Sequence, residues 1–98
     1  MVTLDKTAPC LTTERVRAIA RVLADPRRFQ ILQQIASQNC AGCSDLRESF
    51  PISAATISHH LKELEGVGLI RSDRRGKFVD NTFCRETWDA YLAELKKI

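Results

Sequence analysis

The stretch that decides the fold is PISAATISHHLKELEGVGLI, residues 51–70. Ser53 can cap the amino end of a helix by accepting a hydrogen bond from a backbone amide, and Gly66 and Gly68 end that helix. An apolar stripe for packing recurs at helical spacing and consists of Ala54, Ile57, Leu61 and Leu64. The sequence therefore predicts one capped, amphipathic helix that begins directly after Ser53.

The opposite face of this helix carries short polar side chains and one cation. The residues at its centre and flanks are Ala55, Thr56, Ser58, His59 and Lys62. Hydroxyl and imidazole groups can hydrogen-bond to base edges in a DNA major groove, and a lysine can contact a phosphate. Together with Ser53 at the cap, these residues are the predicted DNA contacts of a recognition helix.

A short basic hairpin is expected directly after the helix. Residues 69–72 and 77–83 have the pattern of two strands joined by a turn at residues 73–76. The cations of the hairpin are Arg71, Arg74, Arg75 and Lys77. Such a cluster can simply solvate a tight turn, or it can contact DNA as a wing beside the recognition helix. The neighbouring helix favours the wing.

The composition is that of a single soluble globular domain. The chain has 98 residues, of which 44% are hydrophobic and 28% are charged, and its net charge is +3. This charge is too small to establish nucleic-acid binding alone, so the argument depends on where the cations lie. No apolar run is long enough for a membrane span or a signal sequence. We therefore expect a cytoplasmic protein that has no membrane partner.

The region before the recognition helix is expected to be helical. A first helix follows a cap at Thr12 or Thr13, and a second follows a cap at Asp25. The second helix is expected to pack inward through Phe29, Leu32, Ile35 and Ala36. A short third helix, from about residue 44 to 50, leads through a tight turn into the recognition helix. This order of elements is that of a helix-turn-helix.

Two helices at the ends of the domain carry apolar stripes that predict a dimer. The last helix, residues 85–98, has a larger apolar face than its position requires, and the first helix has a matching stripe. The expected interface residues are Val16, Ile19, Leu23, Trp88, Tyr91, Leu92 and Leu95. A symmetric dimer presents two recognition helices to half-sites about one DNA turn apart. The expected partner is therefore double-stranded DNA with a palindromic operator.

These elements together predict a mainly α fold of the winged helix-turn-helix class. It comprises about five helices and a two-stranded β-hairpin wing, and it forms a homodimer through its first and last helices. Residues 1–11 are assigned to an amino-terminal arm, and residues 12–98 are assigned to the DNA-binding and dimerisation domain.

Four short motifs become distinctive when they occur together. They are LADPRRFQIL at residues 23–32, SHHLKEL at 58–64, GLI at 68–70 and RRGKFV at 74–79. In combination they resemble the ArsR/SmtB family of bacterial winged-helix repressors, and the resemblance extends over most of the chain. It implies a homodimer that occupies an operator, represses the adjacent genes, and leaves DNA when a metal ion, a metalloid or a thiol-reactive signal binds.

Four cysteines, Cys10, Cys40, Cys43 and Cys84, are candidates for sensing chemistry. In a cytosolic chain, metal or redox chemistry is expected of them rather than a disulfide framework. Cys40 and Cys43 lie at the amino end of the third helix, whose free amides favour a thiolate. The resemblance implies a metal site at this pair, with Cys10 as a third ligand. Three thiolates suit arsenite, whereas zinc or cadmium needs a fourth ligand. No cofactor is expected to be required for DNA binding.

Other roles for the cysteines and histidines remain open. Cys43 and Cys84 can be small buried side chains that only fill space in the core. Cys40 and Cys43 can instead form a thiol redox switch, and a repressor with no metal response is a further alternative. His59 and His60 are consecutive and cannot chelate an ion from one helix face. His59 is expected to face DNA, and His60 is expected to border the core.

Two other function classes fit the sequence less well. A dithiol oxidoreductase needs a strand before its Cys-x-x-Cys pair, and no strand is expected before Cys40. A winged helix that binds protein instead of DNA would show little salt dependence of duplex affinity, whereas a repressor loses affinity steeply as salt rises. No serine, histidine and carboxylate set converges in the expected fold. We therefore expect no enzymatic activity.

Overall fold

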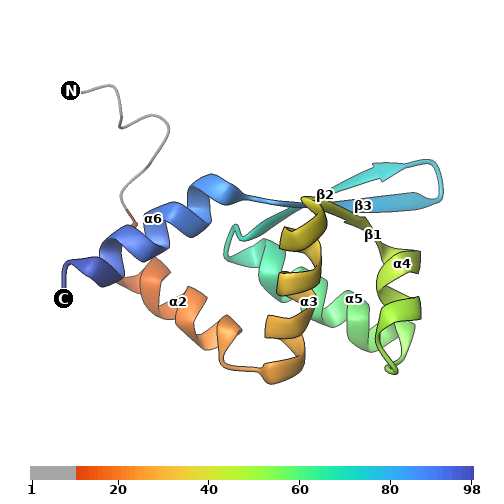
Figure 1. Cartoon of the computed structure of the whole chain (residues 1–98), viewed down its shortest axis with the longest axis horizontal. Helices are drawn as coiled ribbons and strands as arrows, with labels where there is room; N and C mark the ends of the chain where they lie inside the picture. The colour runs from red at the N-terminus through yellow and green to blue at the C-terminus, as the bar shows by residue number, and fades with distance from the viewer. Residues whose placement is uncertain (1–10) are drawn as a thin grey trace.

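The structure, a computed structural model, describes residues 11–98 (Figure 1). Across this range the elements in chain order are α2 (Thr13–Leu23), α3 (Pro26–Gln38), β1 (Cys40–Gly42), α4 (Cys43–Ser49), α5 (Ala54–Gly66), β2 (Ile70–Arg75), β3 (Phe78–Phe83) and α6 (Arg85–Lys96). The five expected helices and the basic hairpin are confirmed. Of the predicted arm, only Leu11 is described, and it packs against the core. Cys10 lies outside the described residues.

Side-chain caps determine where three of the helices begin. Thr12, Asp25 and Ser53 each accept a hydrogen bond from the backbone amide three residues on, at 3.1, 3.0 and 3.1 Å. A cap of this kind stabilises a helix by about 1 kcal/mol. The three bonds confirm Asp25 and Ser53 as caps and select Thr12 over Thr13. The same backbone bond holds the pKa of the Asp25 carboxyl below its ordinary value.

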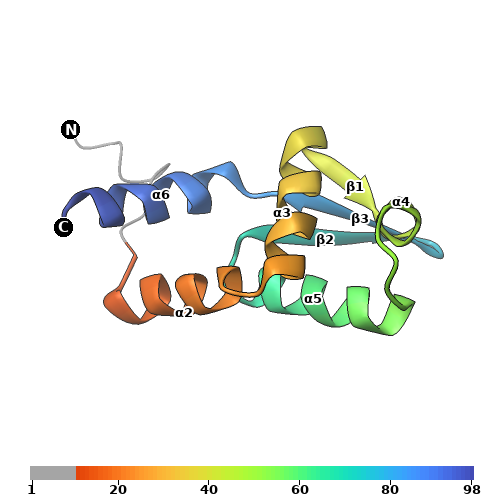
Figure 2. The same cartoon turned by 60° about the horizontal axis from the view of Figure 1, so that its bottom comes forward.

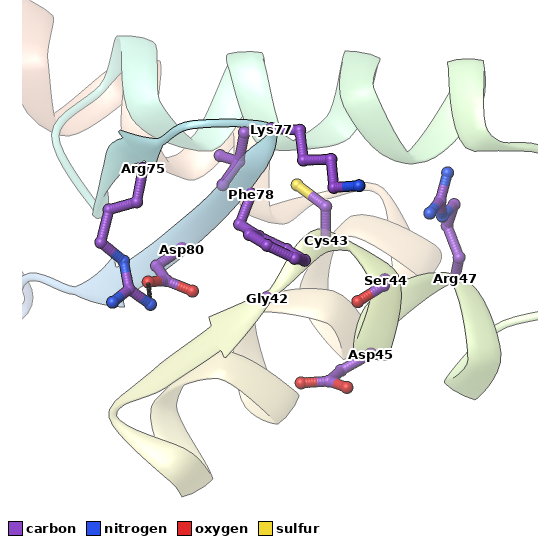
Figure 3. A pocket seen from close by; sticks show the side chains of 10 residues that line it. Gly42, Cys43, Ser44, Asp45, Arg47, Arg75, Lys77, Phe78 and Asp80 are labelled. Carbon is purple, nitrogen blue, oxygen red and sulfur yellow. Dashed lines mark hydrogen bonds and ion pairs between the residues drawn. The ribbon is translucent and has the colours of Figure 1, made fainter.

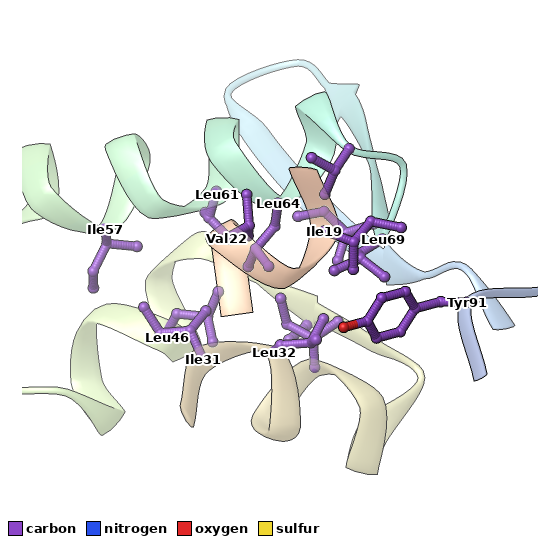
Figure 4. Close-up of a cluster of buried hydrophobic side chains, with 14 residues drawn as sticks. Ile19, Val22, Ile31, Leu32, Leu46, Ile57, Leu61, Leu64, Leu69 and Tyr91 are labelled. Carbon is purple, nitrogen blue, oxygen red and sulfur yellow. The ribbon is translucent and has the colours of Figure 1, made fainter. Parts of the chain in front are cut away.

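One apolar core joins all five helices to the sheet (Figure 4). The helix α3 is central, because it contacts α2, α5, β1 and β3. The fully buried apolar side chains are Ile19, Ile31, Ile35, Leu46, Ile57, Leu64, Leu69 and Ile70. The predicted inward position of Phe29 is wrong, since it is 37% exposed. The buried face of α3 is centred instead on Ile31 and Ile35, one helical turn apart.

Within residues 11–98, no helix has both the length and the apolar character needed to cross a membrane.

The hairpin belongs to a three-stranded antiparallel sheet whose strand order is β1-β3-β2. The strand β1 begins at Cys40 itself, so no strand precedes the Cys-x-x-Cys pair, as expected, although a strand within the pair was not predicted. In β1, Cys40 lies opposite Thr82 and Gly42 lies opposite Asp80. A three-residue strand is too short to show an alternating pattern, so it forms because β3 offers a free edge for backbone hydrogen bonds. At the base of the wing, β3 is therefore hydrogen-bonded to β2 on one edge and to β1 on the other.

Asn81 is the polar centre of this sheet, and it is completely buried. Its Nδ2 donates to the carbonyl oxygen of Ala41 at 3.2 Å and lies 3.5 Å from the Sγ of Cys43. Its Oδ1 accepts a hydrogen bond from the Oγ of Ser72 at 2.9 Å. When both the Nδ2 and the Oδ1 of a buried amide are hydrogen-bonded, the amide holds its hydrogen-bond partners in place. Asn81 thus connects all three strands and the first residue of α4.

The first and last helices lie side by side, at the end of the molecule remote from the wing tip (Figures 1 and 2). Ile19 and Tyr91 were wrongly assigned to a dimer interface, because the chain's own core leaves them only 0% and 7% exposed. The half-buried members of the predicted interface that pack against this core are Val16, Leu23 and Trp88. Leu92 and Leu95 are 39% and 40% exposed, so they leave an open apolar face on α6.

Candidate nucleic-acid interface

The polar face of α5 points away from the core. Burial of Ile57, Leu61 and Leu64 determines which side of the helix faces inward. All the side chains predicted to contact DNA from this helix and its cap are exposed, namely Ser53, Ala55, Thr56, Ser58, His59 and Lys62. The Oγ of Ser53 and the Oγ1 of Thr56 lie 2.9 Å apart and share a hydrogen bond. The exposed face is therefore available to a groove of DNA.

A buried histidine attaches this helix to α3. His60 is 7% exposed, and its Nδ1 accepts a hydrogen bond from the Nε of Arg28 at 3.3 Å. A second nitrogen of Arg28, Nη1, donates to the carbonyl oxygen of Val22 at 3.4 Å. Arg28 thus connects α2, α3 and α5. The expectation that His60 borders the core is confirmed, and His59 is exposed.

The surroundings of His60 favour its neutral form. Burial is the main cause and lowers the pKa of His60 below 6.5, while the Asp25 carboxylate acts in the opposite direction. The positive charges of Arg28, His59 and Arg27 lower it further. Because Nδ1 accepts the hydrogen bond from Arg28, protonation of that atom breaks this hydrogen bond between α3 and α5.

We expect stability to decrease in acid through His60. Its folded-state pKa lies below the unfolded value of 6.5, so the contribution is complete above that pH and is lost as the pH falls below it. Urea unfolding on either side of that pH measures the effect. His60→Gln should show a smaller acid loss than the wild type, whereas the exposed control His59→Gln, which removes only one of the smaller influences on the His60 pKa, should show nearly the wild-type loss. An equal loss in both variants would exclude His60 as the origin.

The wing cations differ in how they are held. Arg71 forms an ion pair with Asp73 at 3.2 Å, and Arg75 pairs with Asp80 across the hairpin. Both arginines are exposed, so the pairs can exchange a carboxylate for a phosphate at little cost, about 0–1 kcal/mol. The structure therefore presents all four predicted wing cations at the surface, with two of them in internal pairs.

A groove with a volume of about 190 Å³ connects the wing to α5. The side chains of Ser58 and Lys62 line it from α5, and Ser72 and Arg74 line it from β2. Hydroxyl donors and cations from the two elements therefore form one continuous surface. Such a surface can contact the bases with α5 and the neighbouring phosphates with the wing.

The structure places the two candidate metal-binding cysteines on opposite faces of the sheet. The Sγ of Cys40 lies 3.7 Å from the Oγ1 of Thr82, whereas the Sγ of Cys43 lies 3.5 Å from the Nδ2 of Asn81. Asn81 and Thr82 are adjacent residues of β3, so their side chains point to opposite faces of the sheet. The two sulfur atoms that lie against them therefore do not converge. Among residues 11–98, no group of three or more histidine, cysteine or carboxylate side chains could hold a metal ion. Burial raises the pKa of the Cys84 thiol and keeps it protonated.

Sequence reasoning missed the structural roles of three residues that shape this surface. The contact of Arg28 with His60 depends on how α3 packs against α5, which no local pattern encodes. Asn81 had an available signal, because asparagine is depleted in strands and its presence in one indicates a specific role. Arg47 on α4 lines a cavity together with Lys77 of the wing, and their separation in sequence hides this proximity.

Sequence comparison finds relatives among regulatory proteins. The family described as "Helix-turn-helix domain" matches residues 23–73. The chain is 33% identical over 66 residues to the arsenical resistance operon repressor of Staphylococcus xylosus, covering 67% of this chain and 62% of the relative. It is 30% identical over 67 residues to the cadmium resistance transcriptional regulatory protein CadC of Listeria innocua, covering 68% and 56%. The chain thus spans less than two thirds of the length of these curated relatives.

Solved structures share the fold. The crystal structure of an ArsR family transcriptional regulator superimposes with a TM-score of 0.72 at 26% identity, over 90% of this chain and 93% of that chain. A homodimeric winged helix-turn-helix DNA-binding domain from Mycobacterium bovis superimposes with a TM-score of 0.71 at 22% identity. The second superposition covers 86% of this chain and 79% of that chain.

Proposed function

Because this chain belongs to the ArsR/SmtB family of winged-helix regulators, we propose that it is a DNA-binding transcriptional repressor that occupies an operator as a homodimer. The observation that carries this proposal is the continuous surface from Ser58 and Lys62 of α5 to Arg74 of the wing. The family and its relatives are regulators and not enzymes. We also propose a cytoplasmic location, because the DNA partner is there.

The proposed docking places α5 in the major groove. Thr56, Ser58 and His59 would contact base edges, and Lys62 would contact a phosphate. The remaining proposed contacts from the helix and its cap are Ser53 and Ala55, and those from the wing are Arg71, Arg74, Arg75 and Lys77. Two copies of α5 in a symmetric dimer require two half-sites, so the proposed operator is an imperfect palindrome.

The proposed dimer forms through α2 and α6. The open apolar face of α6 includes Leu92 and Leu95, which do not belong to the apolar side chains packed on the core. Val16, Leu23 and Trp88 border this face from the two helices. Burying such a face against a second copy removes apolar surface from water, and, because α2 and α6 lie at the end remote from the wing tip (Figure 1), it leaves the two wings at the outer ends of the dimer.

Lys62→Ala tests the DNA-binding proposal. Removing this lysine should weaken binding to the chain's upstream DNA and reduce the slope of log affinity against log salt by about 1.8, the value for one phosphate contact in each of the two half-sites. Fluorescence anisotropy of a labelled duplex at several salt concentrations measures both quantities. The matched control is Lys96→Ala, an exposed lysine at the far end of α6. Equal behaviour of the two variants would contradict the docking, and a flat wild-type salt dependence would support protein binding instead.

We further propose that a thiol-directed inducer, such as arsenite, cadmium or zinc, releases the DNA. The candidate thiols are Cys40 and Cys43, with Cys10 as a third ligand. The two described sulfur atoms face opposite sides of the sheet and do not fit one ion in this conformation. The proposal therefore requires that β1 detach from β3 when both thiols are engaged, which would alter the base of the wing.

Separate Cys40→Ser and Cys43→Ser variants test this second proposal. Both should retain wild-type DNA affinity, and both should lose the release that equimolar arsenite produces, as measured by anisotropy. Cadmium, zinc and peroxide serve as parallel additions. Release by peroxide alone would indicate a thiol redox switch. Binding that no addition changes would indicate a repressor without metal response, in which Cys43 and Cys84 only fill space.

A further inference from the structure

A cavity with a volume of about 440 Å³ lies between α4 and the edge of the wing (Figure 3). Its walls come from two segments far apart in sequence, residues 42–47 and 75–80. The strand β1 ends at Gly42, opposite Asp80, so the outer part of β3 has no neighbouring strand on this side. The cavity fills the space that a longer β1 would occupy, and it opens beside the proposed DNA-binding surface.

Two cations on this cavity lack a negative partner. Arg75 is paired with Asp80, and the carboxylate of Asp45 points away from the side where the Arg47 and Lys77 side chains end (Figure 3). Within residues 11–98, neither Arg47 nor Lys77 takes part in an ion pair. Both line the same cavity. Two positive charges directed into one space repel each other unless an anion lies between them.

We propose that Arg47 and Lys77 together hold one phosphodiester of the operator backbone, beyond the groove that α5 enters. This inference rests on the proposed function and extends the DNA interface to α4. The first helix of a helix-turn-helix crosses the DNA backbone, which brings Arg47 to the correct place. An arginine guanidinium can bind two phosphate oxygens at once, and the lysine adds a second charge from the wing.

The exposure of both side chains favours DNA over a free anion. Arg47 and Lys77 are exposed, and the other polar side chains on the cavity wall are not fully buried. An ion pair in contact with solvent is weak by itself, so a small free anion would bind poorly at this position. A phosphate within a duplex is already held by α5 and the rest of the wing, so this weak contact adds to an existing complex.

The test removes the two positive charges from the protein and, in a second experiment, removes the negative charge from single phosphates of the DNA. Arg47→Gln, Lys77→Gln and the double variant are compared with the matched control Arg17→Gln plus Lys96→Gln, whose two cations are exposed on α2 and α6. Because Arg47 and Lys77 share one phosphate in each half-site, the double variant should lose about 1.8 of the salt slope of the dimer, whereas contacts with two separate phosphates per half-site would give about 3.6. The control pair should keep the wild-type slope.

Methylphosphonate substitution at single backbone positions locates the phosphate. One position in each half-site should weaken wild-type binding and have no effect on the double variant. Equal thermal midpoints of all variants show that folding is unchanged. If the double variant behaves as the control does while Lys62→Ala still weakens binding, the shared phosphate is wrong and the proposed function stands. If the wild type binds no duplex, the proposed function itself fails.

A third measurement separates the DNA backbone from a free anion. Inorganic phosphate replaces chloride at constant ionic strength during the anisotropy titration. The proposal predicts that this replacement leaves the wild-type affinity unchanged. Competition by phosphate in the wild type that disappears in the double variant would show a site for a free anion and would overturn the assignment.

Discussion

A chain that carries both Leu92→Glu and Leu95→Glu is expected to be a folded monomer that binds its operator about a hundredfold more weakly than the wild type. These leucines are 39% and 40% exposed and lie outside the set of side chains packed on the core. Glutamate at these positions therefore leaves the core intact. It places like charges opposite each other in the proposed dimer, and the second half-site no longer contributes to affinity.

Light scattering gives the mass, and anisotropy gives the affinity of the same sample. The control is Ala93→Glu, which adds a negative charge at an exposed position on the same helix. It should leave both the dimer and the affinity close to the wild type. A double leucine variant that keeps the mass of a dimer would contradict the proposed interface. A monomer that retains full operator affinity would contradict the proposed use of two half-sites.

Asn81→Ala is expected to lower the free energy of unfolding by about 2–4 kcal/mol. The substitution leaves the carbonyl of Ala41 and the hydroxyl of Ser72 without their buried partner. In a domain of this size, such a loss lowers the thermal midpoint by on the order of 10 °C. Denaturant unfolding followed by circular dichroism measures the change.

Thr82→Ala provides the matched control for Asn81. Thr82 is the next residue of β3, is only half-buried, and contacts the Sγ of Cys40 at 3.7 Å. Its replacement should cost less than about 1 kcal/mol. Similar losses in the two variants would show that Asn81 has no special role in the sheet. At temperatures where Asn81→Ala remains folded, its DNA affinity should also fall, because the base of the wing is no longer fixed.

The sequence was sufficient for features that depend on local chemistry. Ser53 and Asp25 cap helices through short-range hydrogen bonds, and the spacing of Ile57, Leu61 and Leu64 specifies which face of α5 is buried. Each of these signals lies within one turn or one helix. The recognition helix and the hairpin were therefore predictable without knowledge of the tertiary structure.

Features that depend on contacts between distant segments were not predictable in this way. The strand β1 exists because β3 pairs with it, and three residues carry no period of their own. Ile19 and Tyr91 lie on apolar stripes that fit a core and a dimer interface equally well, and only the fold shows that the core contains them. The family resemblance implied a shared ion for Cys40 and Cys43, but their sulfur atoms lie against adjacent residues of β3, which point to opposite faces.

The attachment of β1 to β3 also has an entropic consequence for association with DNA. A hairpin of residues 70–83 that ordered only on binding would cost on the order of 10 kcal/mol or more in backbone conformational entropy. Here pairing with β1 extends along β3 from Thr82 to Asp80, so folding has already ordered the base of the hairpin. Pairing of β2 with β3 continues the ladder to Arg75 and Phe78 beside the turn, so the wing is preorganised for rigid docking.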